Sequence, residues 1–202
     1  MQVKICGLHP IRDVQLCINL KVNFLGFVFY GKSPRNINLS DIKILSKYNK
    51  ESSNFVAVTV NPTNEFIYKN LLGNFEYIQL HGSETKERVS EIKKMGFKII
   101  KAIKVKGEDD INKYNEFSNA DVILFDTPAM EKSMEFPKEL LNKLPNGKRY
   151  ALAGSISENN VENISKLGVN FFDLSSSLEN QLGYKDHLKI KSFMNKINEL
   201  KN

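Results

Sequence analysis

Two residues in this chain place a reactive side chain at the end of an apolar segment. Cys6 ends the segment VKIC and is followed by Gly7, and Asp126 ends the longer run VILFD. A thiol there could act as a base if its pKa falls, although a cysteine is more often a small buried core residue. A partly desolvated carboxyl group favours its protonated form and suits a general acid, although an aspartate could also only cap the next turn. Cys6 and Asp126 are therefore candidates for a base and an acid.

Further polar or glycine residues recur at or just after the ends of apolar segments. They are Arg35, Gln79, His81, Gly154, Ser155, Asp173, Ser175, Ser176 and Ser177. The planar donors of Arg35 could bind a substrate carboxylate in bidentate fashion or hold a neighbouring carboxylate, and His81 could contact substrate or a backbone group. The turns at 154–155 and 175–177 offer backbone N–H groups and hydroxyls, which suit a phosphate.

The elements that must position these residues are eight strand-like segments. Residues 122–125 are continuously apolar, with β-branched and aromatic types, which is typical of a parallel strand buried on both faces. We expect strands over residues 3–6, 24–29, 55–60, 77–80, 98–105, 122–126, 150–153 and 171–174. We expect helices over residues 10–20, 39–48, 64–72, 83–95, 109–117, 137–144, 158–167 and 186–200.

This alternation of strands and helices predicts an α/β fold, a single (β/α)8 TIM barrel whose parallel eight-stranded sheet closes on itself. One such domain would cover residues 1–202. An open doubly wound sheet is the alternative. It is disfavoured because no GxGxxG sequence follows the first strand and because polar residues recur at every strand end. In a barrel all the strand ends meet at one rim, so the residues named above would converge there.

The composition is that of a globular protein, with 41% hydrophobic and 10% aromatic residues among 202. The net charge of +6 is spread through mixtures of lysine and glutamate without a basic block, which argues against nucleic acid as a partner. That excess could help attract an anionic substrate, or could reflect biased lysine and asparagine usage.

The cysteines and the lengths of the apolar runs indicate which cellular compartment to expect. Cys6 and Cys17 have neither CxxC spacing nor histidine and cysteine neighbours that suggest zinc, which argues against a metal site. No apolar run of signal-peptide or transmembrane type is present. We therefore expect a reduced, soluble, cytoplasmic protein without a membrane partner.

Several short motifs, in this order, resemble those of the phosphoribosylanthranilate isomerase family. They are VKICG at 3–7, LGFVFY at 25–30 with SPR at 33–35, QLHG at 79–82, LFDT at 124–127, LAGSI with ENNV at 152–161, and DLSSSLE with GYKD at 173–186. The matches span nearly the whole chain, and KICG, SPR and QLHG together are far more specific than any one of them alone.

The resemblance implies an isomerase of tryptophan biosynthesis. It would convert N-(5-phosphoribosyl)anthranilate into 1-(2-carboxyphenylamino)-1-deoxyribulose 5-phosphate by an Amadori rearrangement. By the same resemblance, Asp126 is the general acid that opens the furanose ring and Cys6 is the base that removes the C2′ proton. No metal or organic cofactor is expected, because the substrate's own nitrogen serves as the electron sink. A monomer and a homodimer stay equally open.

The resemblance also implies which groups bind this phosphorylated small molecule. Arg35 would hold the anthranilate carboxylate, and the turns at 154–155 and 175–177 would hold the phosphate. The remaining substrate-binding candidates are Gln79, His81 and Asp173.

Two other classes of barrel compete with the isomerase. A degenerate barrel could bind a phosphosugar without turning it over, and the altered loop after the sixth strand is its only support. Another barrel enzyme could act on a ribosyl phosphate. A histidine-pathway isomerase uses paired aspartates on strands one and five, however, and a pentulose-phosphate epimerase needs a His/Asp metal cluster. This sequence lacks both.

Three departures from the family pattern bear on phosphate binding. The loop TPAMEKSMEF at 127–136 replaces a Gly-Gly-x-Gly segment, and Ser155 and Ser177 each stand where the family usually has glycine. We predict that both serines have negative φ and that each hydroxyl donates to the phosphate, because a positive φ would strain them. Lys132 in the altered loop is a candidate for added positive charge.

One further prediction concerns the base. Strand periodicity places Lys4 one pleat repeat, roughly 7 Å, below Cys6 on the same face of the strand. A buried ammonium there would favour the thiolate, so Lys4→Met should raise the pKa of the Cys6 thiol. Cys17, on the apolar side of the first predicted helix, is predicted to be core packing.

Overall fold

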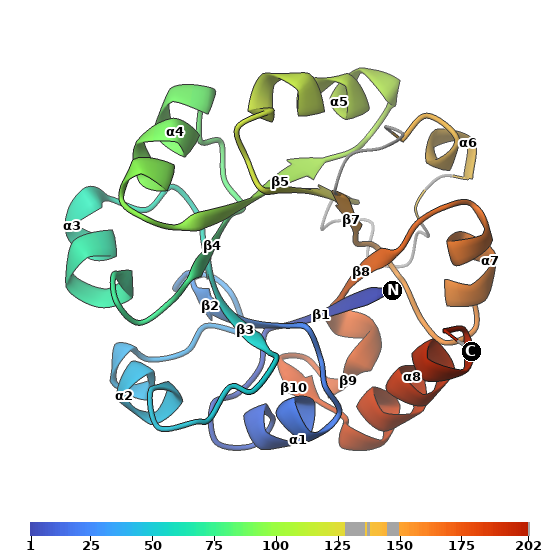
Figure 1. The fold of residues 1–202 in the computed structure, drawn as a ribbon, viewed down its shortest axis with the longest axis horizontal. Helices are drawn as coiled ribbons and strands as arrows, with labels where there is room; N and C mark the ends of the chain where they lie inside the picture. The colour runs from blue at the N-terminus through green and yellow to red at the C-terminus, as the bar shows by residue number, and fades with distance from the viewer. Residues whose placement is uncertain (128–135, 137, 145–149, 202) are drawn as a thin grey trace.

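Eight parallel strands close into a barrel in the order β1 to β8, with helices around the outside (Figure 1). The computed structural model describes residues 1–127, 136, 138–144 and 150–201. β1 pairs with β2 on one side and with β8 on the other, so the sheet has no open edge. The predicted (β/α)8 barrel is therefore confirmed, and the open doubly wound sheet is excluded.

The strands agree closely with the apolar segments of the sequence. They are β1 (Gln2–Cys6), β2 (Phe24–Phe29), β3 (Asn54–Thr59), β4 (Tyr77–Leu80), β5 (Lys98–Lys104), β6 (Val122–Asp126), β7 (Tyr150–Leu152) and β8 (Phe171–Leu174). Each limit lies within one residue of the prediction. Strands buried on both faces are largely apolar, so a change to polar residues marks where they end.

Most of the helices are shorter than predicted. They are α1 (Val14–Asn19), α2 (Ile42–Leu45), α3 (Asn64–Phe66), α4 (Lys86–Lys94), α5 (Glu108–Asn112), α6 (Lys138–Leu141), α7 (Val161–Lys166) and α8 (His187–Glu199). Three are extended by 3-10 or π turns, namely η1 (Leu39–Asp41), η2 (Ile67–Leu71) and η3 (Lys113–Phe117). Helices this short depend on packing against the barrel rather than on intrinsic propensity, so tertiary contacts decide their ends.

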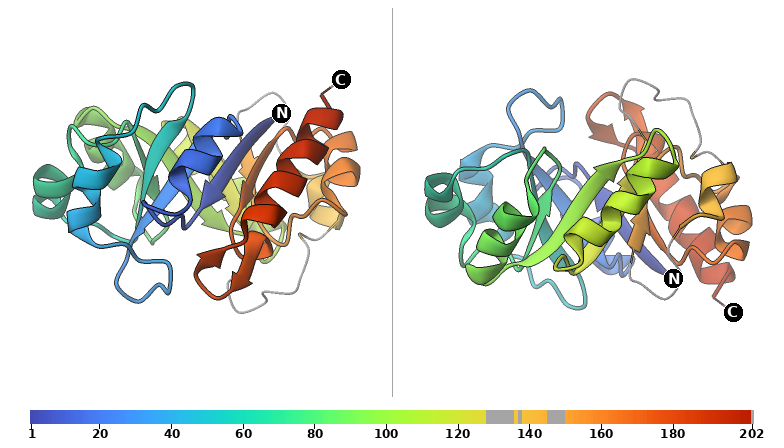
Figure 2. Two further views of the ribbon diagram at one scale, coloured as in Figure 1. Left: turned by 90° about the horizontal axis from the view of Figure 1, so that it is seen from below. Right: turned by 90° about the horizontal axis from the view of Figure 1, so that it is seen from above.

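A β-hairpin that the sequence did not predict follows β8. After the 3-10 turn η4 (Ser176–Leu178), β9 (Glu179–Gln181) pairs antiparallel with β10 (Tyr184–Lys185). These residues are largely polar and too few to show a strand period. Figure 2 shows the hairpin projecting from the end of the barrel opposite the two chain termini. It therefore stands at the carboxyl ends of the strands.

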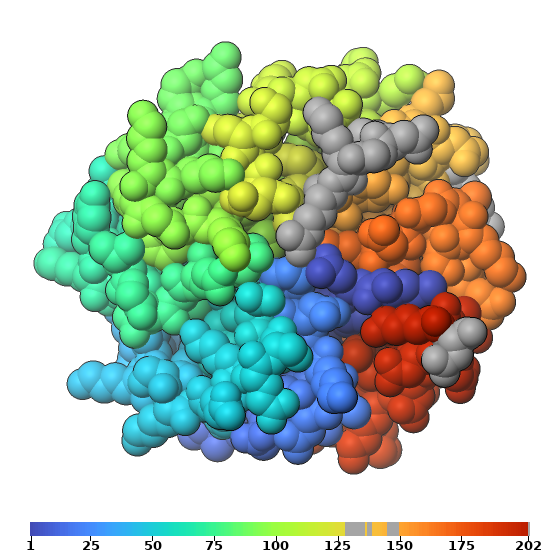
Figure 3. All heavy atoms as spheres, in the orientation of Figure 1, coloured from blue at the N-terminus to red at the C-terminus, as the bar shows by residue number. Residues whose placement is uncertain are grey.

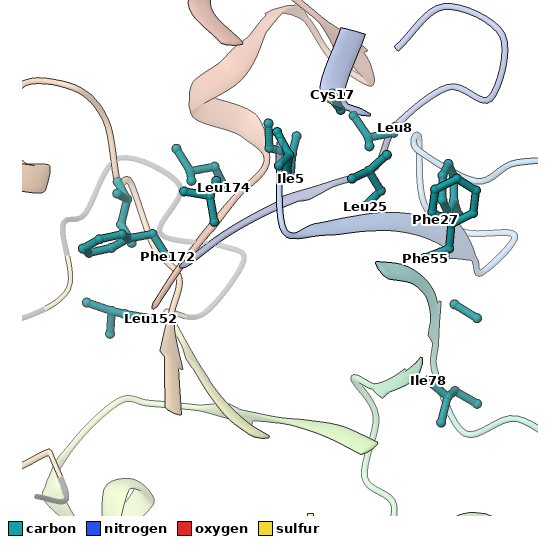
Figure 4. Close-up of a cluster of buried hydrophobic side chains, with 14 of the residues drawn as sticks. Ile5, Leu8, Cys17, Leu25, Phe27, Phe55, Ile78, Leu152, Phe172 and Leu174 are labelled. Atoms are coloured by element: carbon teal, nitrogen blue, oxygen red, sulfur yellow. The ribbon is translucent and has the colours of Figure 1, made fainter. Parts of the chain in front are cut away.

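The core has two layers, separated by the strands. Inside the barrel, Phe24 stacks on Phe171 with ring centroids 5.0 Å apart and meets Tyr77 edge-on at 5.2 Å. These three residues begin β2, β8 and β4, so their rings fill the end of the barrel away from the polar residues. Outward-facing side chains such as Ile5 and Phe27 form the second layer beneath the helices (Figure 4).

The other end of the barrel carries both chain termini. In the space-filling view, the first residues (dark blue) lie beside the C-terminal helix α8 (red) on this face (Figure 3). Among the described residues, no helix is both long enough and apolar enough to span a membrane.

Candidate active site

A pocket of about 890 Å³ opens at the carboxyl ends of the strands. Every residue predicted for the site lines it: Cys6, Arg35, Gln79, His81, Asp126, Gly154, Ser155, Asp173, Ser175, Ser176 and Ser177. Closure of the barrel explains this convergence, because it brings eight strand ends from all parts of the chain to one rim.

On one side of the pocket, three side chains from β4, the loop after it and β6 form a hydrogen-bonded chain. The amide Nε2 of Gln79 lies 2.9 Å from Nδ1 of His81, and Nε2 of His81 lies 3.2 Å from Oδ2 of Asp126. Gln79 is completely buried, whereas the side chains of His81 and Asp126 are 27% and 24% exposed. We call these three residues the acid side. The second carboxylate oxygen of Asp126 has no part in this contact.

Opposite them, Cys6 shares the interior of the barrel with two buried ionisable groups. Nζ of Lys4 lies 3.0 Å from both carboxylate oxygens of Asp173, its register partner on β8. Gly26 on β2 makes room for this group, since a Cβ there would lie 3.1 Å from Lys4 Nζ and 3.2 Å from Cys6 Sγ. We call Lys4, Cys6 and Asp173 the base side.

Burial dominates the electrostatics of the base side. Burial raises the pKa of the Cys6 thiol, although its side chain is partly exposed to the pocket, and the charge of Lys4 lowers that pKa by less. Burial also raises the pKa of Asp173, against the opposing effect of Lys4. Burial alone would lower the pKa of Lys4, but Asp173 and Cys6 together raise it. Lys4 thus acts on the thiol in the predicted direction, but its effect is smaller than that of burial.

Arg35 holds a carboxylate of the protein itself, which was one of its two predicted roles. Its Nε and Nη2 lie 2.6 and 2.8 Å from the two carboxylate oxygens of Glu179, the first residue of β9. Lys185 from β10 donates to the same carboxylate at 2.7 Å. Gly183, at φ +87°, lies so close to Pro34 that a Cβ would come within 2.7 Å of the Pro34 carbonyl oxygen. The hairpin therefore fixes the loop that carries Arg35.

The hairpin also reaches the base side. Lys185 Nζ lies 3.5 Å from the Ser175 hydroxyl, which donates to the backbone carbonyl of Cys6 at 3.1 Å. Burial lowers the pKa of Lys185, and its charge lowers that of Cys6. Although burial opposes it, the two neighbouring cations lower the pKa of Glu179. Arg35, Lys185 and Glu179 together place two positive charges and one negative charge beside the pocket.

The prediction for Ser155 is wrong. Ser155 has φ +47° and follows Gly154 at φ +107°, so two successive residues are left-handed. A Cβ at Gly154 would lie 2.6 Å from Oγ1 of Thr127, so the chain can pass Thr127 only with a glycine there. Asn160 holds this turn, donating to the Ser155 carbonyl at 3.0 Å and accepting from Ser157 N–H at 2.9 Å.

Ser177 differs from Ser155, because it has no positive φ and lies within the 3-10 turn η4. Its backbone agrees with the prediction. Lys132 lies outside the described residues. Among the residues that are described, no three histidine, cysteine or acidic side chains are grouped to hold a metal ion.

Sequence reasoning missed Glu179, Lys185 and Gly26 as parts of the site. Glu179 and Lys185 lie in the motifs DLSSSLE and GYKD, so their position in a matching motif was the available signal. Gly26 interrupts an otherwise apolar strand, which often marks close approach of other atoms. A closed barrel whose strand-end pocket is lined by acidic, basic and hydroxyl side chains has the architecture of a (β/α)8-barrel enzyme.

Comparison with known proteins identifies the family. Residues 3–196 match the model of the family described as N-(5'-phosphoribosyl)anthranilate (PRA) isomerase. The chain is 38% identical to the N-(5'-phosphoribosyl)anthranilate isomerase of Petrotoga mobilis over 210 residues, which cover 100% of this chain and 99% of the relative. The chain therefore belongs to the PRA isomerase family, as its motifs predicted.

Solved structures agree with this assignment. The crystal structure of phosphoribosyl anthranilate isomerase from Thermus thermophilus has a TM-score of 0.89 at 26% identity, covering 99% of this chain and 100% of that chain. Another isomerase structure, in complex with reduced 1-(o-carboxyphenylamino)-1-deoxyribulose 5-phosphate, has a TM-score of 0.83 at 27% identity, covering 98% of this chain and 99% of that chain.

Proposed function

We propose that this chain catalyses the Amadori rearrangement of N-(5-phosphoribosyl)anthranilate to 1-(2-carboxyphenylamino)-1-deoxyribulose 5-phosphate in tryptophan biosynthesis. Membership of the family supports the reaction. The single observation that carries the assignment of roles is the position of Cys6 and Asp126, which line one pocket from β1 and β6, two strands that are not neighbours in the barrel. An acid and a base separated in this way can act in sequence on neighbouring substrate atoms without neutralising each other.

In the proposed mechanism, the carboxyl group of Asp126 gives its proton to the furanose ring oxygen. The bond from this oxygen to C1′ breaks, and the lone pair of the substrate nitrogen forms an iminium. Cys6 then takes the proton from C2′ as a thiolate, the form that the charge of Lys4 favours and burial opposes. The electron pair of that C–H bond forms the enolamine double bond and neutralises the iminium. Tautomerisation of the enolamine gives the ketose.

Two contacts would orient the substrate for these steps. Arg35, held by Glu179, keeps Nη1 outside its bidentate pair and can direct this donor at the anthranilate carboxylate. The turns at 154–155 and 175–177 line the same pocket and would bind the phosphate through backbone N–H groups and hydroxyls.

The test follows the loss of fluorescence when the enzyme meets freshly generated substrate. We expect Cys6→Ser and Asp126→Asn each to lower kcat by about 10²- to 10⁴-fold, because each removes one proton-transfer group. Turnover that survives Asp126→Asn unchanged would contradict the assigned acid. Binding of substrate by the wild-type chain without any loss of fluorescence would favour the degenerate phosphosugar-binding barrel. The cytoplasmic location and the choice between monomer and homodimer stay predictions.

A further inference from the structure

We propose that Gln79 is a positioning residue that holds His81 as the neutral tautomer protonated on Nε2, with this N–H directed at Asp126. This role replaces the substrate contact predicted for Gln79. The proposal rests on the proposed function only where it assigns Asp126 as the acid. The state of the His81 ring can be measured without any turnover.

The placement of the two residues follows from the strand period. Gln79 and His81 are two positions apart, so both face the interior of the barrel, and Gln79 lies one residue layer deeper. The contact from Gln79 Nε2 to His81 Nδ1 is 2.9 Å, and the contact from His81 Nε2 to Asp126 Oδ2 is 3.2 Å. The chain therefore runs from a fully buried amide to a carboxyl group at the pocket.

The chemistry of these groups determines where the proton lies. An amide Nε2 can only donate, so Nδ1 of His81 must accept and carries no proton. In neutral imidazole the proton is then on Nε2, where it is donated to Oδ2 of Asp126. With the amide reversed, Oε1 would require a proton on Nδ1, and the neutral ring would turn a bare Nε2 towards Asp126.

A second observation supports a dedicated role for the amide. Among the described residues, no donor reaches Oε1 of Gln79, although this atom is buried. The register neighbours of Gln79 on β3 and β5 are Val58 and Ile100, both apolar. A buried acceptor without a partner costs free energy that an apolar side chain would avoid. The feature that offsets this cost in the structure is the contact of Nε2 with His81.

The tautomer matters for an acid because of what remains after proton transfer. When Asp126 gives its proton to the ring oxygen, the new carboxylate is stabilised by the N–H already directed at it. No proton leaves His81 in this step. A bare Nε2 in the same place would instead accept the proton of Asp126 and compete with the substrate for it. Gln79 thus acts on catalysis through His81, without touching the substrate.

The first measurement is the ¹⁵N chemical shifts of the imidazole nitrogens, which distinguish the tautomers. The chain has three histidines, so the His81 signals are identified by their loss in His81→Asn. We expect wild-type His81 to be protonated on Nε2. Gln79→Leu should give a mixture of tautomers, and Gln79→Glu should move the proton to Nδ1, because a carboxylate accepts there. Nε2 protonation that is the same in all three proteins would overturn the proposal.

The second measurement is a double-mutant cycle in the fluorescence assay. We expect Gln79→Leu to lower kcat about tenfold with KM nearly unchanged, and to have no further effect in the His81→Asn background. A rise in KM with unchanged kcat would show that Gln79 contacts the substrate. An equal fall in kcat in both backgrounds would show that Gln79 does not act through His81. Thermal unfolding of each variant checks that the fold is kept, since Gln79→Leu also removes the hydrogen-bond partner of His81 Nδ1.

The two measurements separate the inference from the proposed function. If the wild-type chain fails to turn over the substrate, the proposed function fails, while the ring shifts still test the control of the tautomer by Gln79. If turnover is normal and the ¹⁵N shifts of His81 do not change in the Gln79 variants, only the positioning role is wrong.

Discussion

The two sides of the pocket handle polar groups in different ways. On the base side, Lys4 and Asp173 form an ion pair whose side chains are only 1% and 6% exposed, next to a thiol. On the acid side, His81 and Asp126 are about a quarter exposed and are joined to a neutral buried amide. The base side thus concentrates ionisable groups in the barrel interior, and the acid side keeps them at the partly exposed mouth of the pocket.

This difference shows where each side carries its energetic cost. The base side carries desolvation, which raises the pKa of Cys6 by more than the charge of Lys4 lowers it, and the charge of Asp173 adds to the rise. The acid side carries its cost in a neutral feature, the orphan acceptor of Gln79, and the turn that follows β7 carries its cost in the left-handed Ser155. Changes of charge should therefore be severe on the base side, and changes of backbone freedom should be felt at the turn after β7.

The largest effect is expected from breaking the buried ion pair. Lys4→Met leaves the carboxylate of Asp173 buried without its partner and should lower the free energy of unfolding by about 3–5 kcal/mol. Adding Asp173→Leu should restore most of this loss, because the double variant leaves no unpaired charge. Urea unfolding measures both. The control is Lys98→Met, which breaks the ion pair with Glu76 at 52% exposure on both side chains and should change stability far less. Equal losses of stability in Lys4→Met and Lys98→Met would show that the buried ion pair contributes no more than the exposed one.

Removing either charge of this ion pair should shift the pKa of the Cys6 thiol, and the two shifts should have opposite directions. Lys4→Met removes a charge that lowers the pKa of Cys6, so that pKa should rise further. Asp173→Asn removes a charge that raises it, so the pKa should fall. The pH dependence of the rate of thiol alkylation measures both shifts, with Cys17→Ala in each protein so that one thiol reacts. Shifts of the same sign in the two variants would mean that local unfolding, and not the neighbouring charges, determines the apparent pKa of the Cys6 thiol.

Cys17 tests the effect of burial on a thiol pKa, because no lysine among the described residues is hydrogen-bonded to this thiol. It lies on α1 and belongs to the outer layer of the core (Figure 4), and burial followed by the charge of Asp13 raises its pKa from 9.0 to about 12. Because the folded value is the higher one, the stability linked to Cys17 is complete below pH 9 and is lost as pH rises towards 12. Relative to Cys17→Ala, the wild type should lose up to about 1.4 kcal/mol per pH unit in this window. Parallel stability curves for the two proteins would contradict the raised pKa.

The smallest effect separates the two serines that stand in place of glycine. Ser155→Gly relieves a left-handed serine and should raise the free energy of unfolding by at most about 1 kcal/mol, because glycine also gains entropy in the unfolded chain. Ser177→Gly is the matched control, since Ser177 has no positive φ and should only lose stability. Thermal unfolding of both variants distinguishes them. A stabilising effect at 177, or a destabilising effect at 155, would reverse the assignment of strain.

The sequence by itself determined the strands and the residues at their ends. Continuous apolar runs such as residues 122–125 have few ways to be buried other than as parallel strands covered on both faces, and most of the runs end at or next to a polar residue. Eight of them in alternation with helices predict the barrel, and the barrel predicts that Cys6 and Asp126 share one rim. This reasoning uses only local period and chain order, which the sequence contains directly.

Only the tertiary structure decided how the site residues pair. Lys4 meets Asp173 because closure of the barrel sets β1 in register with β8, and Arg35 meets Glu179 because a hairpin folds back over its loop. Gly154 has no room for a Cβ beside Thr127, a residue of another strand end, and Ser155 after it is left-handed. A residue's type limits which partners are chemically possible, but barrel closure and register decide which of them comes within bonding distance.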